Sequence, residues 1–348
     1  MRYISLFSGI EAATVAAEGL GWEPVCFAEI DPFPSAVLAY HYPNVPNVGD
    51  VSKVDWSPYR GKCDLIVGGS PCQSFSIAGK REGLNGASGL MWEYVRAIRE
   101  LRPEWIVWEN VQGALSSSGG GDFRCLLSAL DELGYGLAWR ILDAQFFGVP
   151  QRRRRVFLVG HFGDRPPTEV LFERESLRGD FETSRKKREA LTARACRCAY
   201  ESKSDCLNAG DPQSKRVYRT YGVAPEPSSG TTEGMQLAPA ILCVADDNAH
   251  AAIDQDVCGT LKVGGAAPMV AYDDTGGEMV VRKLTPKECE RLQGFPDDYT
   301  KVPYKGKPAE DCPDTPRYKA LGNSMSVPVM RWIFERLDTA SKGSTIDD

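Results

Sequence analysis

Short apolar runs alternate with longer amphipathic segments over the first 160 residues of the chain. The apolar runs lie at 3–7, 24–28, 64–68, 105–108 and 156–160. Their length favours buried strands over helices. The segments whose apolar residues follow helical spacing are 10–19, 91–102 and 122–133. Strands that alternate with helices predict an α/β fold with a mostly parallel, Rossmann-like sheet.

The pattern changes after residue 161. Up to about residue 281, turn residues are dense and helical periodicity is poor, which predicts a smaller, irregular β-rich domain. Helical order returns at Thr285, Pro286 and Glu288, a capping-box signature for a helix that ends at Gly294. The apolar residues of a last helix are Val329, Ile333, Phe334 and Leu337.

We therefore expect one domain made of residues 1–161 and 282–340, interrupted by a second domain over residues 162–281. The polar tail, residues 341–348, is expected to fray. A chain of 348 residues with 42% hydrophobic residues can build a sizeable core for this arrangement.

Composition narrows the function classes. The net charge of −6 argues against a general attraction to nucleic acid, although a local basic groove stays open. The 11 cysteines are an odd number without regular spacing, and neither a signal peptide nor a membrane-spanning run is visible. We therefore expect reduced thiols and a soluble cytoplasmic protein without membrane contact. We expect no metal, because Cys196, Cys198 and Cys206 lack paired Cys-x-x-Cys spacing.

The most informative polar segment is GGSPCQSFS, residues 68–76. A strand-like run delivers Pro71 and Cys72 onto this glycine-rich loop. Strands of open α/β sheets end at a ligand crevice, and a cysteine attacks only as its thiolate, so a polar, partly exposed loop suits it. Cys72 is therefore a candidate nucleophile, although a lone Pro-Cys pair is more often an ordinary surface turn.

Acidic residues follow two of the other strands. Glu29 and Asp31 lie at the end of the second strand, about twenty residues after Gly9, where a carboxylate can accept hydrogen bonds from a ribose. Only Gly9 of a G-x-G-x-x-G pattern is present, so this signal is weak alone. Glu109 ends the strand at 105–108, and a parallel sheet would bring it beside Cys72. By itself, Glu109 is more often a solvated strand end.

Four consecutive arginines, residues 152–155, precede the strand at 156–160. If they enter that strand, Arg153 and Arg155 point to one face, and Arg152 and Arg154 to the other. One pair could then face the site while the other meets phosphate, which indicates an anion or nucleic-acid role over a merely solvated patch.

Taken in order, these segments resemble the DNA (cytosine-5)-methyltransferases of bacteria and phages, over about residues 3–160 and 282–337. The motifs that match are Phe7-Ser8-Gly9, Glu29, Asp50-Val51, Pro71-Cys72-Gln73, Glu109-Asn110-Val111, residues 151–155, residues 282–296 and Gly322-Asn323-Ser324. The chain departs from the pattern at Glu11, where many members have a second glycine. This leaves the contacts of that turn to the methionine carboxylate of the methyl donor open.

The resemblance implies a role for each matching position. The catalytic residues would be Cys72, Glu109, Arg153 and Arg155. S-adenosyl-L-methionine would be bound by Phe7, Gly9, Ile10, Glu29, Ile30, Asp50, Val51, Ser70, Pro71, Leu90, Asn323 and Ser324. Double-stranded DNA would be contacted by Gln73, Ser76, Lys80, Arg81, Arg152 and Arg154. Residues 162–281 would form the target-recognition domain, whose DNA sequence stays open.

The implied reaction is methyl transfer to carbon 5 of a flipped-out cytosine through a Cys72 adduct at carbon 6. Restriction-modification or phage DNA protection is the expected setting, in a bacterial or phage-infected cell. We expect a monomer that needs no physical contact with a companion endonuclease.

Three alternatives stay open. An RNA (tRNA) cytosine-5 methyltransferase would use the same motifs, and the large irregular recognition segment argues for DNA instead. A non-catalytic DNA-binding relative would keep the fold without the chemistry, against which the presence of Cys72, Glu109 and Arg155 speaks. A nicotinamide-dependent oxidoreductase would need the glycine fingerprint that is incomplete here.

Overall fold

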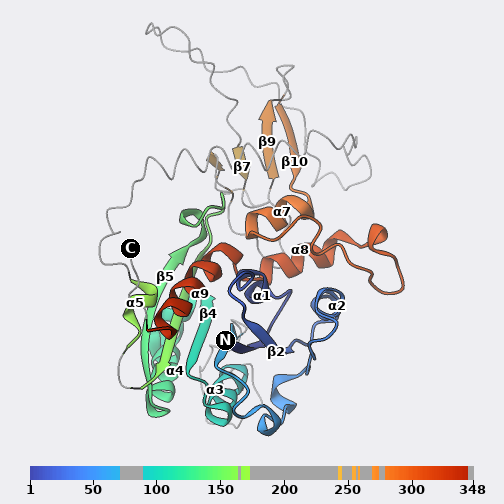
Figure 1. The fold of residues 1–348 in the computed structure, drawn as a ribbon. Helices are drawn as coiled ribbons and strands as arrows, with labels where there is room; N and C mark the ends of the chain where they lie inside the picture. The colour runs from blue at the N-terminus through green and yellow to red at the C-terminus, as the bar shows by residue number, and fades with distance from the viewer. Residues whose placement is uncertain are drawn as a thin grey trace, which may run out of the picture.

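The computed structural model describes residues 1–70, 89–163, 166–172, 242–244, 253–255, 258, 269–273 and 279–343 (Figure 1). A six-stranded sheet with the order β2-β1-β3-β4-β6-β5 forms the centre of the larger part. Its strands are β1 (Arg2–Leu6), β2 (Glu23–Ala28), β3 (Leu65–Gly68), β4 (Trp105–Val111), β5 (Tyr135–Asp143) and β6 (Arg154–Phe162). The Rossmann-like, mostly parallel sheet expected from the sequence is confirmed.

One strand runs against the others. β6 is antiparallel to both β4 and β5, while β1, β2, β3 and β4 are parallel neighbours. Only ten residues, 144–153, connect β5 to β6, and a parallel crossover needs a dozen or more. Because β6 is reversed, it begins where β4 ends, and Arg155 pairs with Val111.

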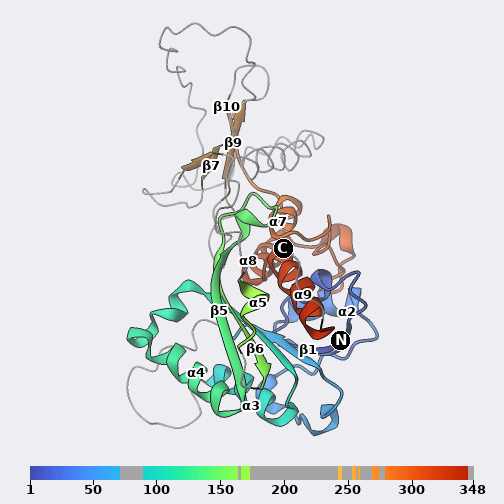
Figure 2. The same cartoon turned by 60° about the vertical axis from the view of Figure 1, so that its left-hand side comes forward.

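Helices cover both faces of the sheet (Figure 2). They are α1 (Ala12–Ala16), α2 (Pro32–His41), α3 (Gly89–Leu101), α4 (Gly121–Glu132), α5 (Thr168–Leu171), α7 (Pro286–Gln293), α8 (Asp314–Asn323) and α9 (Val327–Ser341). Side chains alternate along each strand, so that Ile66 packs with α3 and α4, whereas Leu65 and Val67 pack with α1 and α9. Both faces of the central strands β1, β3 and β4 are therefore largely buried, which explains their mostly apolar sequences.

The helical periodicity proved a good guide at four places. α3, α4, α7 and α9 lie within a few residues of the expected segments, and the Thr285–Glu288 capping box and the left-handed Gly294 stop are both present. The helix expected over 10–19 was wrong in length, because Glu11 caps α1 in a left-handed conformation and the chain turns away after Ala17. α8 was not expected, since few of its residues are apolar and Pro316 lies in its first turn.

α7 and α8 are joined by a buried ion pair. Arg317 Nη2 lies 3.1 Å from Glu290 Oε1, and both side chains are almost fully buried. Glu290 also accepts hydrogen bonds from the backbone N–H groups of Asp298 and Thr300. These bonds satisfy a carboxylate that would otherwise be costly to bury, and they hold the segment after α7 in place.

A second, antiparallel sheet has the order β10-β9-β7-β8. Its strands are β7 (Leu242–Val244), β8 (Ile253–Gln255), β9 (Met269–Asp273) and β10 (Met279–Lys283). It lies beyond α7, at one end of the larger part (Figure 1). Cys258 contacts the segment that leads into β6. Its N–H donates to Pro150 O and its carbonyl oxygen accepts from Arg152 N, both at 2.8 Å. The short strands expected between residues 162 and 281 are therefore present in the described part of that segment.

Among the helices that the structure describes, none is long and apolar enough to cross a membrane.

Candidate active site

The ends of β3 and β4 lie side by side, with Gly68 pairing with Trp108. Beyond β3, the Asn110 side-chain amide donates to the Ser70 carbonyl oxygen at 2.8 Å. The Trp108 indole N–H donates to Ser70 Oγ at 3.2 Å. Ser70 is buried, so these contacts fix the backbone two residues before Cys72 at the end of β4.

Gly69 is packed against the backbone of Glu109. A Cβ atom at position 69 would lie 2.7 Å from the Glu109 carbonyl oxygen and 3.2 Å from its Oε2. A larger residue would therefore have to displace β4 at the point where it presents its carboxyl group.

We expect Gly69→Ala to lower the free energy of unfolding by about 1–3 kcal/mol, because it overpacks a close backbone contact. Chemical denaturation of the full chain measures this difference. Gly113→Ala is the matched control, since a Cβ there meets only Val111 Cγ2, at 3.9 Å. The control should change stability by less than about 0.5 kcal/mol. Equal stability of the two variants would contradict the close packing of Gly69.

Glu109 is a buried carboxyl group, with 9% of the residue exposed. Its Oε1 makes no hydrogen bond within the described residues and lies 3.4 Å from Arg155 Nε. Burial raises the pKa of Glu109, and the charges of Arg155 and Arg153 offset only part of this rise. The protonated form is thus favoured more strongly than for an exposed glutamate.

The arginine run alternates as expected from a strand. Arg153 is buried and Arg155 is partly buried beside Glu109, whereas Arg152 and Arg154 are exposed. The reversed direction of β6 brings its first residues to the same edge as the ends of β3 and β4. Two guanidinium groups therefore lie near the buried carboxyl group, and two face outward.

Arg153 is tied to the segment after α8. Its Nη2 donates to Ser324 O at 2.6 Å and to Gly322 O at 3.3 Å. Its Nε and Nη1 are buried and make no hydrogen bond within the described residues. Burial and the neighbouring Arg155 lower the pKa of Arg153 to about 9, against the opposing effect of Glu109. A cation with two unused donors at this edge suits a polar ligand.

A second group of residues surrounds the turn after β1. The Gly9 N–H donates to Glu29 Oε2, and the Asp31 N–H donates to Glu29 Oε1, both at 2.7 Å. The backbone N–H of Glu29 is in turn held by Asn47 Oδ1 at 3.0 Å. The carboxylate of Glu29 thus bridges the ends of β1 and β2 and keeps further lone pairs for a ligand.

Two apolar residues flank this carboxylate. Ile30 is 70% exposed, which is unusual for a large apolar side chain. Phe7 is partly buried and has a left-handed backbone, φ 53°. Exposed apolar surface next to hydrogen-bonding oxygen atoms suits a ligand that combines a flat ring with hydroxyl groups.

The other positions assigned to the cofactor differ in exposure. Ile10, Val51 and Ser324 are buried as whole residues, so the described conformation exposes little of them to a ligand. Asp50 caps the short helix Val51–Lys53, and the hydrogen bonds from Ser52 lower the pKa of its carboxyl. Leu90 is partly buried at the start of α3.

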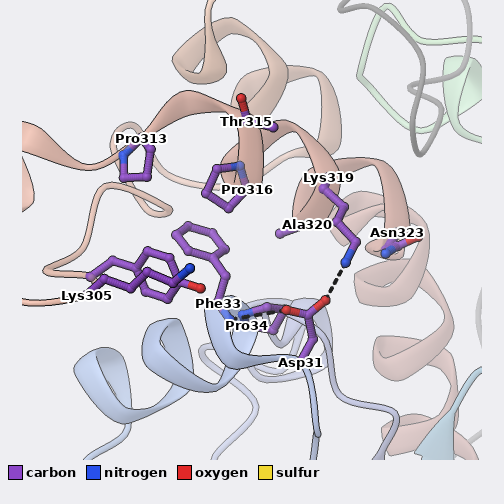
Figure 3. Close-up of a pocket in the computed structure, with 11 residues that line it drawn as sticks. Asp31, Phe33, Pro34, Lys305, Pro313, Thr315, Pro316, Lys319, Ala320 and Asn323 are labelled. Carbon is purple, nitrogen blue, oxygen red and sulfur yellow. Dashed lines mark hydrogen bonds and ion pairs between the residues drawn. The ribbon is translucent and has the colours of Figure 1, made fainter.

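A cavity of about 330 Å³ lies between the start of α2 and α8 (Figure 3). Phe33 and Pro316 face each other across it. At its other side, Lys319 Nζ lies 2.6 Å from Asp31 Oδ2, and Asn323 borders the same hollow. The start of α2, which follows Glu29, and α8, which ends at Asn323, therefore line the same cavity.

Several assigned residues fall outside the described ranges. They are Pro71, Cys72, Gln73, Ser76, Lys80 and Arg81. The cysteines considered for metal binding, Cys196, Cys198 and Cys206, also lie outside. Within the described ranges, no three His, Cys, Asp or Glu side chains gather in a way that could hold a metal ion.

Sequence reasoning missed residues that position the site. Asn110 holds Ser70, and Asn47 holds Glu29 through both of its side-chain amide atoms. Arg96 of α3 donates to the carbonyl oxygens of Val51 and Val54. No local sequence pattern indicates the positioning role of Arg96. Asn110 directly follows a candidate acid at a strand end, so its positioning role could have been predicted.

Residues 1–339 match the family model described as C-5 cytosine-specific DNA methylase. The chain is similar to the DNA N-6-adenine-methyltransferase of Escherichia phage P1, with 35% identity over 97% of this chain and 61% of that protein. It is also similar to the type II methyltransferase M2.BsuMI of Bacillus subtilis (strain 168), with 31% identity over 100% of this chain and 77% of the relative.

Among solved structures, the S. pombe Dnmt2 methyltransferase has a similar fold. Its TM-score is 0.62 at 20% sequence identity, and the match covers 98% of this chain and 99% of that one. The present chain thus matches almost the full length of the Dnmt2 chain but only 61% of the length of the phage P1 relative.

Proposed function

The chain belongs to the C-5 cytosine-specific DNA methylase family, and from this premise we propose that it methylates carbon 5 of a flipped-out cytosine in duplex DNA. The observation that carries the proposal is Glu109, a buried carboxyl group with a raised pKa beside Arg155. It lies next to the strand end that leads into Pro71 and Cys72. A covalent nucleophile and a proton donor are the two groups that this chemistry requires.

Cys72 is the proposed nucleophile. Carbon 5 of cytosine is a poor nucleophile, and addition of the Cys72 thiolate to carbon 6 turns the ring into an enamine that reacts at carbon 5. After the methyl group has been received, a base removes the proton from carbon 5, and the electron pair of that bond restores the ring double bond as the sulfur leaves. One difficult step is thereby divided into easier ones.

Glu109 is the proposed acid. As the thiolate adds, negative charge develops on the ring and is neutralised by a proton at nitrogen 3, which the protonated Glu109 can supply. When the sulfur leaves, the Glu109 carboxylate takes this proton back, so the product is neutral 5-methylcytosine. Arg155, 3.4 Å from this carboxyl group, would orient the base and balance its charge. Arg153, with two unused buried donors, is the second candidate for contact with the substrate.

The proposed methyl donor is S-adenosyl-L-methionine, whose sulfonium group makes its methyl group electrophilic. The described residues fit such a molecule. Glu29 would accept hydrogen bonds from the ribose, and the exposed side chain of Ile30 would cover a face of the adenine together with Phe7. Asn323 and Ser324, next to Arg153, would border the methionine part.

DNA contact is proposed for the residues that face outward from the same edge. Arg152 and Arg154 are exposed there, and exposed guanidinium groups bind phosphate well. Lys80, Arg81, Gln73 and Ser76 are assigned to DNA from the family motifs alone. Because the ring faces are not accessible inside a duplex, the cytosine has to be flipped out, at a cost of a few kcal/mol.

We propose that residues 162–281 form the target-recognition domain and that residues 1–161 with 282–340 form the catalytic domain. The second sheet, together with the backbone bonds between Cys258 and residues 150–152, supports this division. The type II relatives favour a role in restriction-modification or in protection of phage DNA. We propose a monomer that needs no contact with an endonuclease.

Analysis of the methylated nucleoside tests the proposed function. The purified full chain is incubated with methyl-labelled S-adenosyl-L-methionine and either duplex DNA or tRNA, and the nucleic acid is digested and separated. We expect the label in 5-methyldeoxycytidine from DNA. Label in N6-methyladenine, as the name of the phage P1 relative would suggest for that protein, or label in tRNA would contradict the proposal. Bisulfite sequencing of DNA from expressing cells would then identify the target site.

A further inference from the structure

Glu11 lies at an unexpected place in the turn after β1. The Glu11 N–H donates to Ser8 O at 3.0 Å, which closes this turn, and Gly9 within it is bound to Glu29. Glu11 has a left-handed backbone, φ 66°, that costs most L-residues energy and suits glycine. The side chain caps α1 by accepting from Thr14 N, but the left-handed backbone alone does not call for a carboxylate at this position.

The side chain of Glu11 is completely buried. Its Oε1 accepts hydrogen bonds from Thr14 N at 3.1 Å and from Thr14 Oγ1 at 3.0 Å. Its Oε2 makes no hydrogen bond within the described residues. Burying a carboxylate with an oxygen left unbound is unfavourable unless a positive group compensates it.

Among the described residues whose hydrogen bonds or charges shift the pKa of Glu11, none is a cation. Burial raises the pKa of Glu11 to about 7, against the lowering effect of the Ser5 and Thr14 hydroxyls, and the charge of Glu29 adds to the rise. The titratable groups around it on neighbouring elements are Tyr3, Tyr42, Tyr299 and Glu29. From α9, Arg331 approaches α1 but donates to Val15 O instead.

We propose that Glu11 determines the specificity of the cofactor site: from its buried position behind the turn, and without touching the cofactor, its carboxylate favours the positively charged sulfonium donor over the product left after methyl transfer. The inference rests on the proposed function, because it takes S-adenosyl-L-methionine as the donor. Donor and product, S-adenosyl-L-homocysteine, share every group except the methyl group and the charge on sulfur. A buried negative charge near the turn that binds them therefore attracts the charged sulfur of the donor but not the neutral sulfur of the product.

This preference would assist turnover. The product binds the same turn as the donor and has to leave before the next cycle. A carboxylate that binds the cation more tightly than the neutral thioether lowers the affinity for the product relative to the donor. The proposal also explains why a buried, left-handed glutamate is tolerated at this position.

Calorimetric titration of the full chain with donor and with product tests the proposal. We expect Glu11→Gln to lower the ratio of donor affinity to product affinity by about tenfold, mainly through weaker donor binding. Glu11→Gly, which suits the left-handed backbone, should lower the ratio equally. Glu18→Gln, the same change at an exposed position after α1, should leave the ratio unchanged. Circular dichroism melts check that each variant is folded.

The wild-type chain provides a test that needs no substitution. Protonation removes the negative charge of Glu11, so the affinity ratio should fall as the pH is lowered from about 8.5 to 5.5 through the raised pKa. The fall should exceed any change seen in Glu11→Gln over the same range.

Equal losses of donor and product affinity in Glu11→Gln, or an unchanged ratio, would overturn the inference and leave Glu11 a structural residue. A wild-type chain that binds neither molecule would instead refute the proposed methyl donor. The two failures are therefore distinguishable.

Discussion

Replacement of Cys72 by serine is expected to abolish methyl transfer while DNA binding is largely retained. A serine hydroxyl is scarcely ionised at neutral pH, so it cannot add to carbon 6 as a thiolate does. Loss of a covalent nucleophile has cost other enzymes up to about 10⁶-fold in rate, and we expect a loss of at least about 10³-fold here. Single-turnover transfer of a labelled methyl group to duplex DNA measures the rate, and a gel-shift titration measures binding.

Cys125→Ser is the matched control for this prediction. Cys125 is an exposed cysteine of α4 that lies outside the proposed site, and its replacement should leave the rate unchanged. If Cys72→Ser transferred methyl groups at the wild-type rate, another residue would have to be the nucleophile. If it lost DNA binding in parallel with activity, the defect would reflect folding or binding and not chemistry.

Replacement of Glu109 by glutamine has the second largest expected effect. The amide keeps the size of the side chain but cannot donate a mobile proton to nitrogen 3. General acid catalysis is worth about 10²–10⁴-fold, so we expect a rate loss in that range. Glu104→Gln, an exposed change just before β4, is the matched control and should be without effect.

The pH dependence of the rate and of the unfolding free energy of the wild-type chain gives two further tests of Glu109. Because the folded-state pKa of Glu109 is raised, the native state holds the proton to a higher pH than the unfolded chain does. Activity that needs the protonated acid should fall as the pH rises through this raised pKa. The stability contributed by proton uptake is likewise present at low pH and lost as the pH rises through it.

Glu109→Gln should remove both effects. Its rate should lack the decline on the alkaline side, and the unfolding free energy of the variant should equal or exceed that of the wild type at about pH 8. A variant that is strongly destabilised at this pH, or that keeps the alkaline decline in rate, would contradict the assignment of Glu109 as the acid.

Much of the fold could be predicted from local sequence. Buried strands of a doubly covered sheet are mostly apolar, and β1, β3 and β4 show this in the runs 3–6, 65–68 and 105–108. The Thr285 capping box and Gly294 define α7 by backbone chemistry that needs no tertiary contact. The direction of β6 could not be predicted from its own apolar run, which suits parallel and antiparallel pairing equally; it follows from the short connection to β5, whose end was not predicted.

For the candidate site, sequence patterns predicted where single residues lie along their strands but not the contacts between them. Placing Glu109 at a strand end required only strand order, and the alternating exposure of Arg152 to Arg155 followed from strand geometry. The bonds from Asn110 to Ser70 and from Arg153 to Ser324 join residues 40 and 171 positions apart. Local patterns hold no information on such pairs. The burial of Glu11 was also unforeseen, since its neighbours Tyr42 and Tyr299 come from distant elements.

In the proposed reaction, a cysteine sulfur becomes bonded to a cytosine ring during each turnover. Duplex DNA that contains 5-fluorocytosine at the target site tests it most directly, because fluorine at carbon 5 cannot leave as a proton does and the adduct is trapped. With S-adenosyl-L-methionine present, we expect a denaturation-resistant complex whose tryptic peptide carries the nucleotide on Cys72, and none with Cys72→Ser. Absence of a covalent complex on DNA shown to be methylated in its unfluorinated form, or attachment at another residue, would contradict the account.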